Sequence, residues 1–137
     1  MKKIFIITLS ILLNINFLYA DDRSSELNHL FNELKIKDKN LSFEVEQQIW
    51  KIWSTHPNNN RLTSMLAAGS NFMNNNEYSK AVEIFTQVIN LDPTWAEAWN
   101  KRATVLYIIG EFEKSQNDID EVLKLEKRHF GALAGQG

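Results

Sequence analysis

The chain has 137 residues, of which 44% are hydrophobic and 23% charged, as expected for a single soluble domain. Its 15 Lys and Arg residues are outnumbered by 17 Asp and Glu, for a formal net charge of −2. This balance argues against a nucleic-acid partner, because nucleic-acid binding requires a clustered basic surface. The absence of cysteine excludes disulfides, thiolate nucleophiles, cysteine-ligated zinc and a lipidated N-terminal cysteine.

Residues 1–20 have the organisation of a secretory signal peptide: Lys2 and Lys3, an apolar run, and a polar start at Asp21. As a helix, the apolar run spans only about 22 Å, short of the roughly 30 Å hydrocarbon core of a bilayer. We therefore expect export, most simply to the periplasm, with cleavage before Asp21. An uncleaved N-terminal anchor is the alternative, because Leu18 is larger than the residue usually found three positions before a cleavage point.

Residues 21–60 are predicted to form a helical hairpin. Ser24 and Ser25 are candidate N-caps of its first helix, and the second helix is expected over residues 43–54. A turn beginning at Pro57 ends the hairpin. The helical apolar stripes comprise Leu27, Leu30, Phe31 and Leu34 in the first helix and Val45, Ile49, Ile52 and Trp53 in the second.

Beyond Arg61 the sequence repeats with a period of 34 residues. Each recurring pair keeps its size class, large for large and small for small, and only Ser115 is more polar than its mate. Such agreement at one offset indicates stacked copies of a helix pair. The pairs are Met65 and Trp99, Gly69 and Ala103, Phe72 and Leu106, Tyr78 and Phe112, Ala81 and Ser115, Phe85 and Ile119, Val88 and Val122, and Leu91 and Leu125.

This pattern resembles the tetratricopeptide repeat (TPR), with an aromatic, a small residue and an aromatic on its first helix, then Ala, an aromatic and a closing Pro. The first copy closes with Pro93, whereas the second has Lys127 there. The resemblance implies an all-α fold of helix-turn-helix repeats stacked as a short α-solenoid. Its repeats cover residues 61–94 and 95–128, and the N-terminal hairpin is interpreted as a cap or a degenerate repeat.

The register continues into residues 129–137, where Ala132 and Leu133 repeat Ala98 and Trp99. The closing run from Arg128 also resembles that of small exported bacterial proteins of this kind. A third first-helix therefore begins here, and its apolar face has no second helix to cover it. We expect the chain to be a fragment of a longer TPR protein, or this segment to dock onto a partner.

No constellation of residues indicates catalysis, a cofactor or a metal. His29, His56 and His129 lie in separate segments without metal-ligand spacing, and polar surface or loop positions are expected for them. The acidic run over residues 117–121 lacks the central Gly of a calcium loop and is interpreted as a solvated helix face. We therefore expect no catalytic, cofactor or metal site, and no enzyme.

The family resemblance implies that the first helices line a concave groove that holds a partner peptide or helix. A Lys–Asn clamp for a C-terminal carboxylate is not supported, because Leu66 and Ser70 occupy its positions. Trp95 is left open between exposure for binding and a structural role. The predicted groove residues are Leu66, Ser70, Met73, Trp95, Asn100, Lys101, Thr104, Tyr107 and Ile108, flanked by Thr63 and Glu97.

The function that follows is a non-enzymatic protein–protein interaction scaffold or adaptor of the cell envelope. The alternative is a small-molecule or lipid-binding periplasmic accessory protein. A bound apolar ligand, detected by native mass spectrometry, would separate the two.

Overall fold

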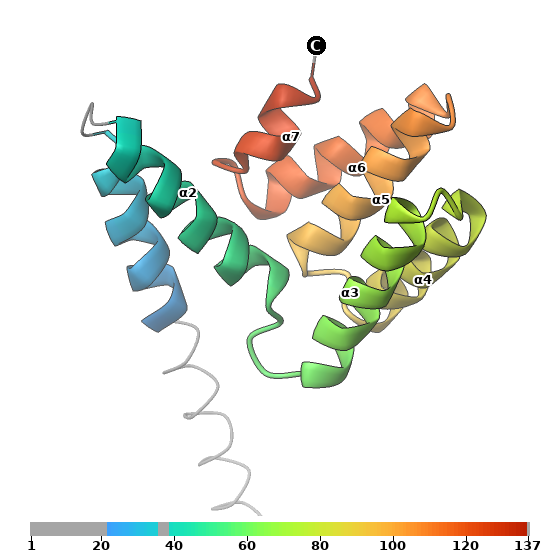
Figure 1. Cartoon of the computed structure of the whole chain (residues 1–137), viewed down its shortest axis with the longest axis horizontal. Helices are drawn as coiled ribbons and strands as arrows, with labels where there is room; N and C mark the ends of the chain where they lie inside the picture. The colour runs from blue at the N-terminus through green and yellow to red at the C-terminus, as the bar shows by residue number, and fades with distance from the viewer. Residues whose placement is uncertain (1–21, 36–38, 137) are drawn as a thin grey trace, which may run out of the picture. The chain divides into compact units, whose positions relative to one another are not determined.

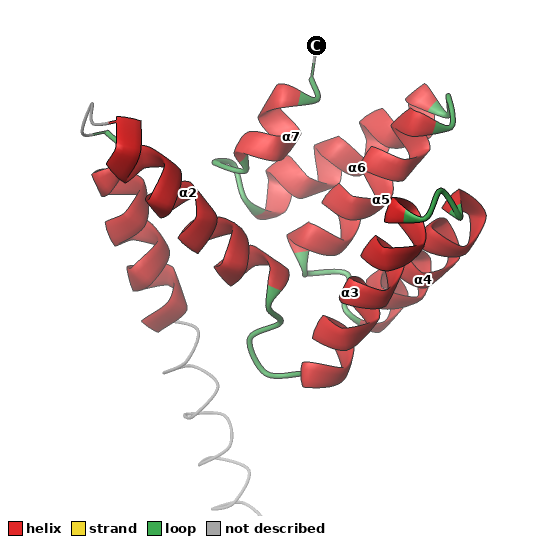
Figure 2. Cartoon of the chain, viewed as in Figure 1, coloured by secondary structure: helices red, strands yellow, loops and turns green. Residues whose placement is uncertain are grey.

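The computed structural model describes residues 22–35 and 39–136, so the predicted signal peptide lies outside the described residues. All regular structure among the described residues is helical (Figure 2). None of the described helices is long and apolar enough to cross a membrane. The chain divides into two compact units, residues 1–58 and 59–137 (Figure 1).

The first unit is the predicted hairpin. Its described helices cover residues 22–33 and α2, Lys39–Ser54, so Ser24 and Ser25 lie within the first helix and the prediction that they cap it was wrong. Arg23 donates hydrogen bonds to the carbonyls of Ile52, at 2.6 Å, and Thr55, at 2.9 Å, and thereby ties the two helices together. Among its described residues, the buried apolar ones are Leu27, Leu30, Val45, Ile49 and Trp53.

The second unit contains the repeats. Each helix packs against the next along the chain, from α3 to α7. The first helices α3, α5 and α7 follow one another in one layer, while α4 and α6 lie on the other side of the unit (Figure 1). The helices are α3 (Asn60–Asn74), α4 (Tyr78–Leu91), α5 (Ala96–Ile108), α6 (Phe112–Leu125) and the short α7 (Phe130–Ala134). The predicted all-α, TPR-like architecture is confirmed.

The turns inside the two repeats are equivalent. Asn76, with φ 62°, ends the first helix of one repeat, and Gly110, with φ 83°, does so 34 residues later. In each turn the following N–H, of Glu77 or Glu111, donates to a carbonyl five residues back at 2.9 Å. This is the Schellman hydrogen bond, which requires a left-handed residue, and Gly or Asn adopts that conformation most easily.

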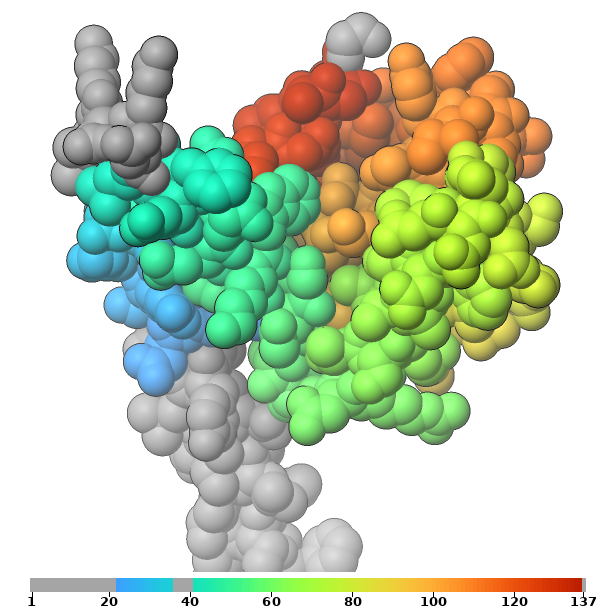
Figure 3. All heavy atoms as spheres, in the orientation of Figure 1, coloured from blue at the N-terminus to red at the C-terminus, as the bar shows by residue number. Residues whose placement is uncertain are grey.

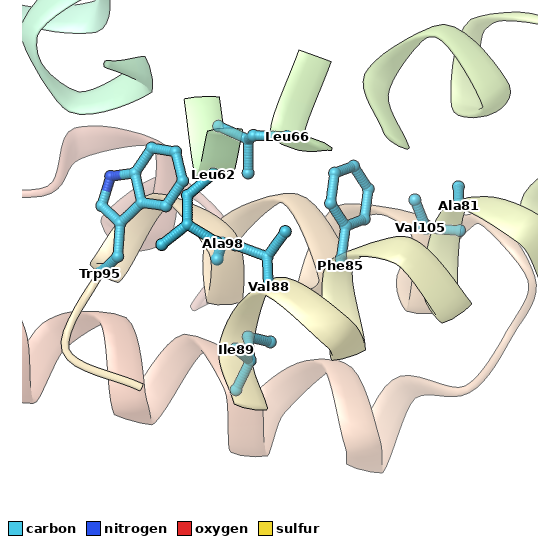
Figure 4. Close-up of a cluster of buried hydrophobic side chains, with 9 residues drawn as sticks. All are labelled: Leu62, Leu66, Ala81, Phe85, Val88, Ile89, Trp95, Ala98 and Val105. Atoms are coloured by element: carbon cyan, nitrogen blue, oxygen red, sulfur yellow. The ribbon is translucent and has the colours of Figure 1, made fainter. Parts of the chain in front are cut away.

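The core of the second unit contains the ring of Phe85 (Figure 4), which lies against Gly69. Phe85 is fully buried, and a Cβ atom on Gly69 would lie 2.5 Å from its Cε1. The absence of a side chain at Gly69 therefore lets α3 approach α4 closely. The buried members of the cluster are Leu62, Leu66, Ala81, Phe85, Val88, Ile89, Trp95, Ala98 and Val105.

A polar network joins α4, α5 and α6. The Nε and Nη2 atoms of Arg102 each donate to Asp118 at 2.8 Å, and Nη1 donates to Thr86 Oγ1 at 3.0 Å. The same guanidinium lies 5.1 Å from the ring centroid of Trp99. Because Asp118 is buried, the interpretation of residues 117–121 as a solvated face was wrong at that position.

Candidate functional site

The predicted groove residues divide by exposure into two groups. Tyr107 and Ile108, at the end of α5, are 64% and 49% exposed, so both are accessible to a partner. Thr104 is exposed as well, and Ser70, Met73 and Lys101 are partly exposed. The accessible part of the predicted groove therefore centres on the C-terminal half of α5.

Three of the predicted groove residues are buried. Leu66 and Trp95 belong to the hydrophobic core cluster, where Figure 4 shows Trp95 beside Leu62. Asn100 is buried next to Glu97. The expectation that Leu66 and Asn100 present their side chains to a partner was wrong, because both are buried. For Trp95, which was left open, burial in the core cluster favours the structural role.

A buried polar cluster occupies the corresponding place in the second repeat. His129 Nε2 lies 3.0 Å from Glu97 Oε2, and both side chains are fully buried. Asn100 Nδ2 donates to the same oxygen at 3.1 Å, and the Lys101 ammonium lies 3.4 Å from Glu97 Oε1. Oε2 thus has two hydrogen-bonding neighbours, whereas Oε1 has the Lys101 charge but no hydrogen bond, and the positive charge offsets part of the cost of burying the carboxylate. His129 lies in the loop before α7, as one of the two expected positions, but it is buried and not on the surface.

The hydrogen bonds indicate the tautomer of the neutral His129 ring. The backbone N–H of Ala132 donates to Nδ1 at 3.3 Å, which makes His129 the side-chain N-cap of α7. Because Nδ1 accepts, the ring proton of the neutral imidazole is on Nε2, which donates to Glu97. One side chain therefore both caps α7 and connects it to α5.

Comparison in the 34-residue register shows that the polar cluster replaces an apolar one. His129 stands in the place of Trp95, and Asn100 in the place of Leu66. Both members of each pair are buried. The sequence contained this signal, since two neighbouring apolar positions become polar together, but single-residue reasoning about the histidines could not detect it.

A cavity of about 390 Å³ lies between α5, α6 and α7. In the space-filling view the surface between α7 (red) and the end of α5 (orange) is recessed (Figure 3). None of the lining residues carries an Asp, Glu, Lys, Arg or His side chain. The lining residues are Asn100, Ala103, Thr104, Tyr107, Ile108, Ser115, Ile119, Gly131, Ala134 and Gly135.

The described residues offer no group of three or more His, Cys, Asp or Glu side chains placed to hold a metal ion. His56 lies in the loop after α2, one of the two expected positions, but it is buried there, and its Nδ1 accepts from the N–H of Asn58 at 3.3 Å. His29, 73% exposed at its side chain, is a surface residue as expected.

Comparison with known proteins agrees with the fold. The family model of the tetratricopeptide repeat matches residues 62–94. A TPR repeat-containing protein of Rhizobium etli is 31% identical over 110 residues, which cover 80% of this chain and 53% of the relative. An uncharacterized protein of Methanocaldococcus jannaschii is 33% identical over 54 residues, or 39% of this chain and 63% of that protein.

The chain thus spans about half the length of the Rhizobium relative that it matches. Residues 62–94 match the tetratricopeptide repeat, and the predicted resemblance of the chain to the tetratricopeptide repeat family is confirmed. Repeats of this kind generally mediate protein–protein interaction, and proteins built from them are typically scaffolds rather than enzymes.

Proposed function

We propose that this protein is a non-enzymatic scaffold of the cell envelope that binds a partner polypeptide along the surface formed by α5 and α7. The observation that carries the proposal is the exposure of Tyr107 and Ile108. Two large apolar side chains side by side on a helix end, next to a cavity without charged side chains, are typical of a binding surface.

The energetics favour Tyr107 as the principal contact. It packs edge-on against Phe112, with ring centroids 5.3 Å apart, so its ring is already partly ordered before a partner binds. A pre-ordered aromatic side chain loses less conformational entropy on binding, which is one reason that tyrosine is common among residues that dominate interface energies.

The experiment compares partner capture by Tyr107→Ala with capture by Leu91→Ala, using the exported protein as bait in a crosslinked envelope extract. Leu91 is 60% exposed on α4, in the other layer, and serves as a matched control. Tyr107→Ala is expected to weaken capture at least tenfold with the melting temperature nearly unchanged. Equal capture by both variants contradicts the proposal.

The envelope location rests on the N-terminal sequence. A charged start, an apolar run and a polar residue after position 20 support export and cleavage before Asp21. N-terminal sequencing of protein purified from the envelope fraction should therefore begin at Asp21. Membrane-bound protein that retains Met1 would instead support an uncleaved anchor.

A further inference from the structure

The cavity between α5, α6 and α7 lies where the second repeat has no counterpart of an aromatic ring of the first repeat. In the first repeat the ring of Phe85 packs directly on Gly69. In the second, the equivalent residues are Ile119 and Ala103, and both line the cavity. Ile119 on α6 is smaller than its counterpart Phe85, and the methyl group of Ala103, which replaces Gly69, does not fill the space that the ring would occupy.

Three polar side chains of the cavity wall donate hydrogen bonds within the fold. Ser115 Oγ donates to the carbonyl of Ala103 at 2.8 Å, and Thr104 Oγ1 donates to the carbonyl of Asn100 at 3.0 Å. Asn100 Nδ2 is bound to Glu97. A charged occupant would lose its hydration without meeting an opposite charge in the wall, so an uncharged apolar occupant is favoured.

The surface beside the cavity indicates that this occupant belongs to a polypeptide. Tyr107 and Ile108 line the cavity and yet remain 64% and 49% exposed, so the apolar surface continues from its wall onto the outside of α5. A small molecule in the cavity would leave that outer surface in water. A polypeptide that places one side chain in the cavity covers it with the residues on either side.

We propose that this cavity receives one aromatic or branched apolar side chain of the partner polypeptide, with Ile119 and Ala103 as its floor. The proposal rests on the proposed function and adds the chemistry of the partner: its central contact residue is apolar and uncharged. A partner that is anchored by a carboxylate or an ammonium group at this position is excluded.

The first test uses side-chain analogues as probes and methyl NMR spectra of the full chain. Toluene is expected to shift the methyl signals of Ile119 and Ala103 saturably, whereas propionate and butylammonium at equal concentration leave them unchanged. The double variant Ala103→Gly/Ile119→Phe recreates the Gly69–Phe85 pair of the first repeat, and it should weaken toluene binding at least tenfold. Leu125→Phe, an exposed position on α6 outside the cavity, is the control and should bind toluene normally.

A second variant keeps the test possible if Ala103→Gly/Ile119→Phe does not fold. Ala134 is exposed on α7 and lines the cavity, so Ala134→Phe obstructs the cavity without altering Ile119 or Ala103. It should also weaken toluene binding tenfold. The proposal is wrong if toluene causes no saturable shift, or if neither variant reduces it.

Partner capture then separates this proposal from the proposed function. If Tyr107→Ala loses the partner and Ala103→Gly/Ile119→Phe retains it, the binding surface stands and the cavity proposal is wrong. If neither variant loses it, the proposed function is wrong. A small apolar ligand seen by native mass spectrometry and lost in the double variant, or a dimer that the double variant makes monomeric, would overturn the partner side chain as occupant.

Discussion

The contact between Gly69 and Phe85 can be tested by adding one methyl group. In Gly69→Ala the new Cβ would lie 2.5, 2.9 and 2.9 Å from three carbons of the Phe85 ring. Because Phe85 is fully buried, its ring has no free space into which to move. Overpacking of this kind costs about 1–3 kcal/mol, and three contacts under 3.0 Å place this site near the upper end.

The higher helix propensity of alanine offsets about 1 kcal/mol of that cost. We therefore expect Gly69→Ala to lower the free energy of unfolding of the second unit by about 2 kcal/mol, or its melting temperature by roughly 10 °C. Asn71→Ala is the control, because Asn71 is exposed on the same helix and its replacement also raises helix propensity without a clash. The measurement is urea unfolding followed by circular dichroism.

A double variant shows whether the ring contact is the cause. Gly69→Ala/Phe85→Ile places in the first repeat the pair that the second repeat has, Ala103 and Ile119. Its loss of stability should be smaller than the sum of the two single losses by about 1 kcal/mol or more. If the losses are additive, or if Gly69→Ala is stabilising, the small residue does not set the spacing of α3 and α4.

Three further perturbations test the interior. His129→Ala should cost about 3 kcal/mol of unfolding free energy because Glu97 stays buried after losing a partner, and Glu97→Ala should add little to that loss in a double-mutant cycle. Trp95→Ala should cost about 3–5 kcal/mol, whereas an exposed tryptophan would cost almost nothing. Burial alone would raise the pKa of Glu126, but hydrogen bonds from Arg128 and its charge lower that pKa below 4.5. The resulting stabilisation is present above the unfolded-state pKa and is lost as pH falls through the lowered folded value. Glu126→Gln should therefore make the urea midpoint of unfolding depend less steeply on pH below 4.5. An unchanged pH dependence would mean that the ion pair contributes nothing.

The repeat architecture could be predicted from the sequence because residues of the same size class recur every 34 positions. The size match of residues such as Gly69 and Ala103 at one offset indicated helix pairs, and the helices of the second unit lie where that register predicts. Helix starts were harder to predict. Ser24 and Ser25 are good capping residues, but the first helix already includes them.

The binding surface was predicted less well than the fold. The 34-residue register predicts which positions belong to the first helices. It does not predict which of their side chains are buried by residues of a neighbouring loop. Trp95 precedes α5 and is buried in the core cluster with Leu66, and His129 precedes α7 and pairs with Glu97. Burial at these positions depends on contacts between segments more than 25 residues apart, which single-helix patterns do not contain.

The central claim is that a partner binds on the surface of α5, and site-specific photo-crosslinking tests it most directly. A photo-reactive phenylalanine analogue is placed at Ile108, 49% exposed on α5, or at Gln87, exposed on α4 in the other layer. Irradiation of cells is predicted to give a discrete crosslinked partner from position 108 and none from position 87. No partner from 108, or the same products from both positions, would contradict the account.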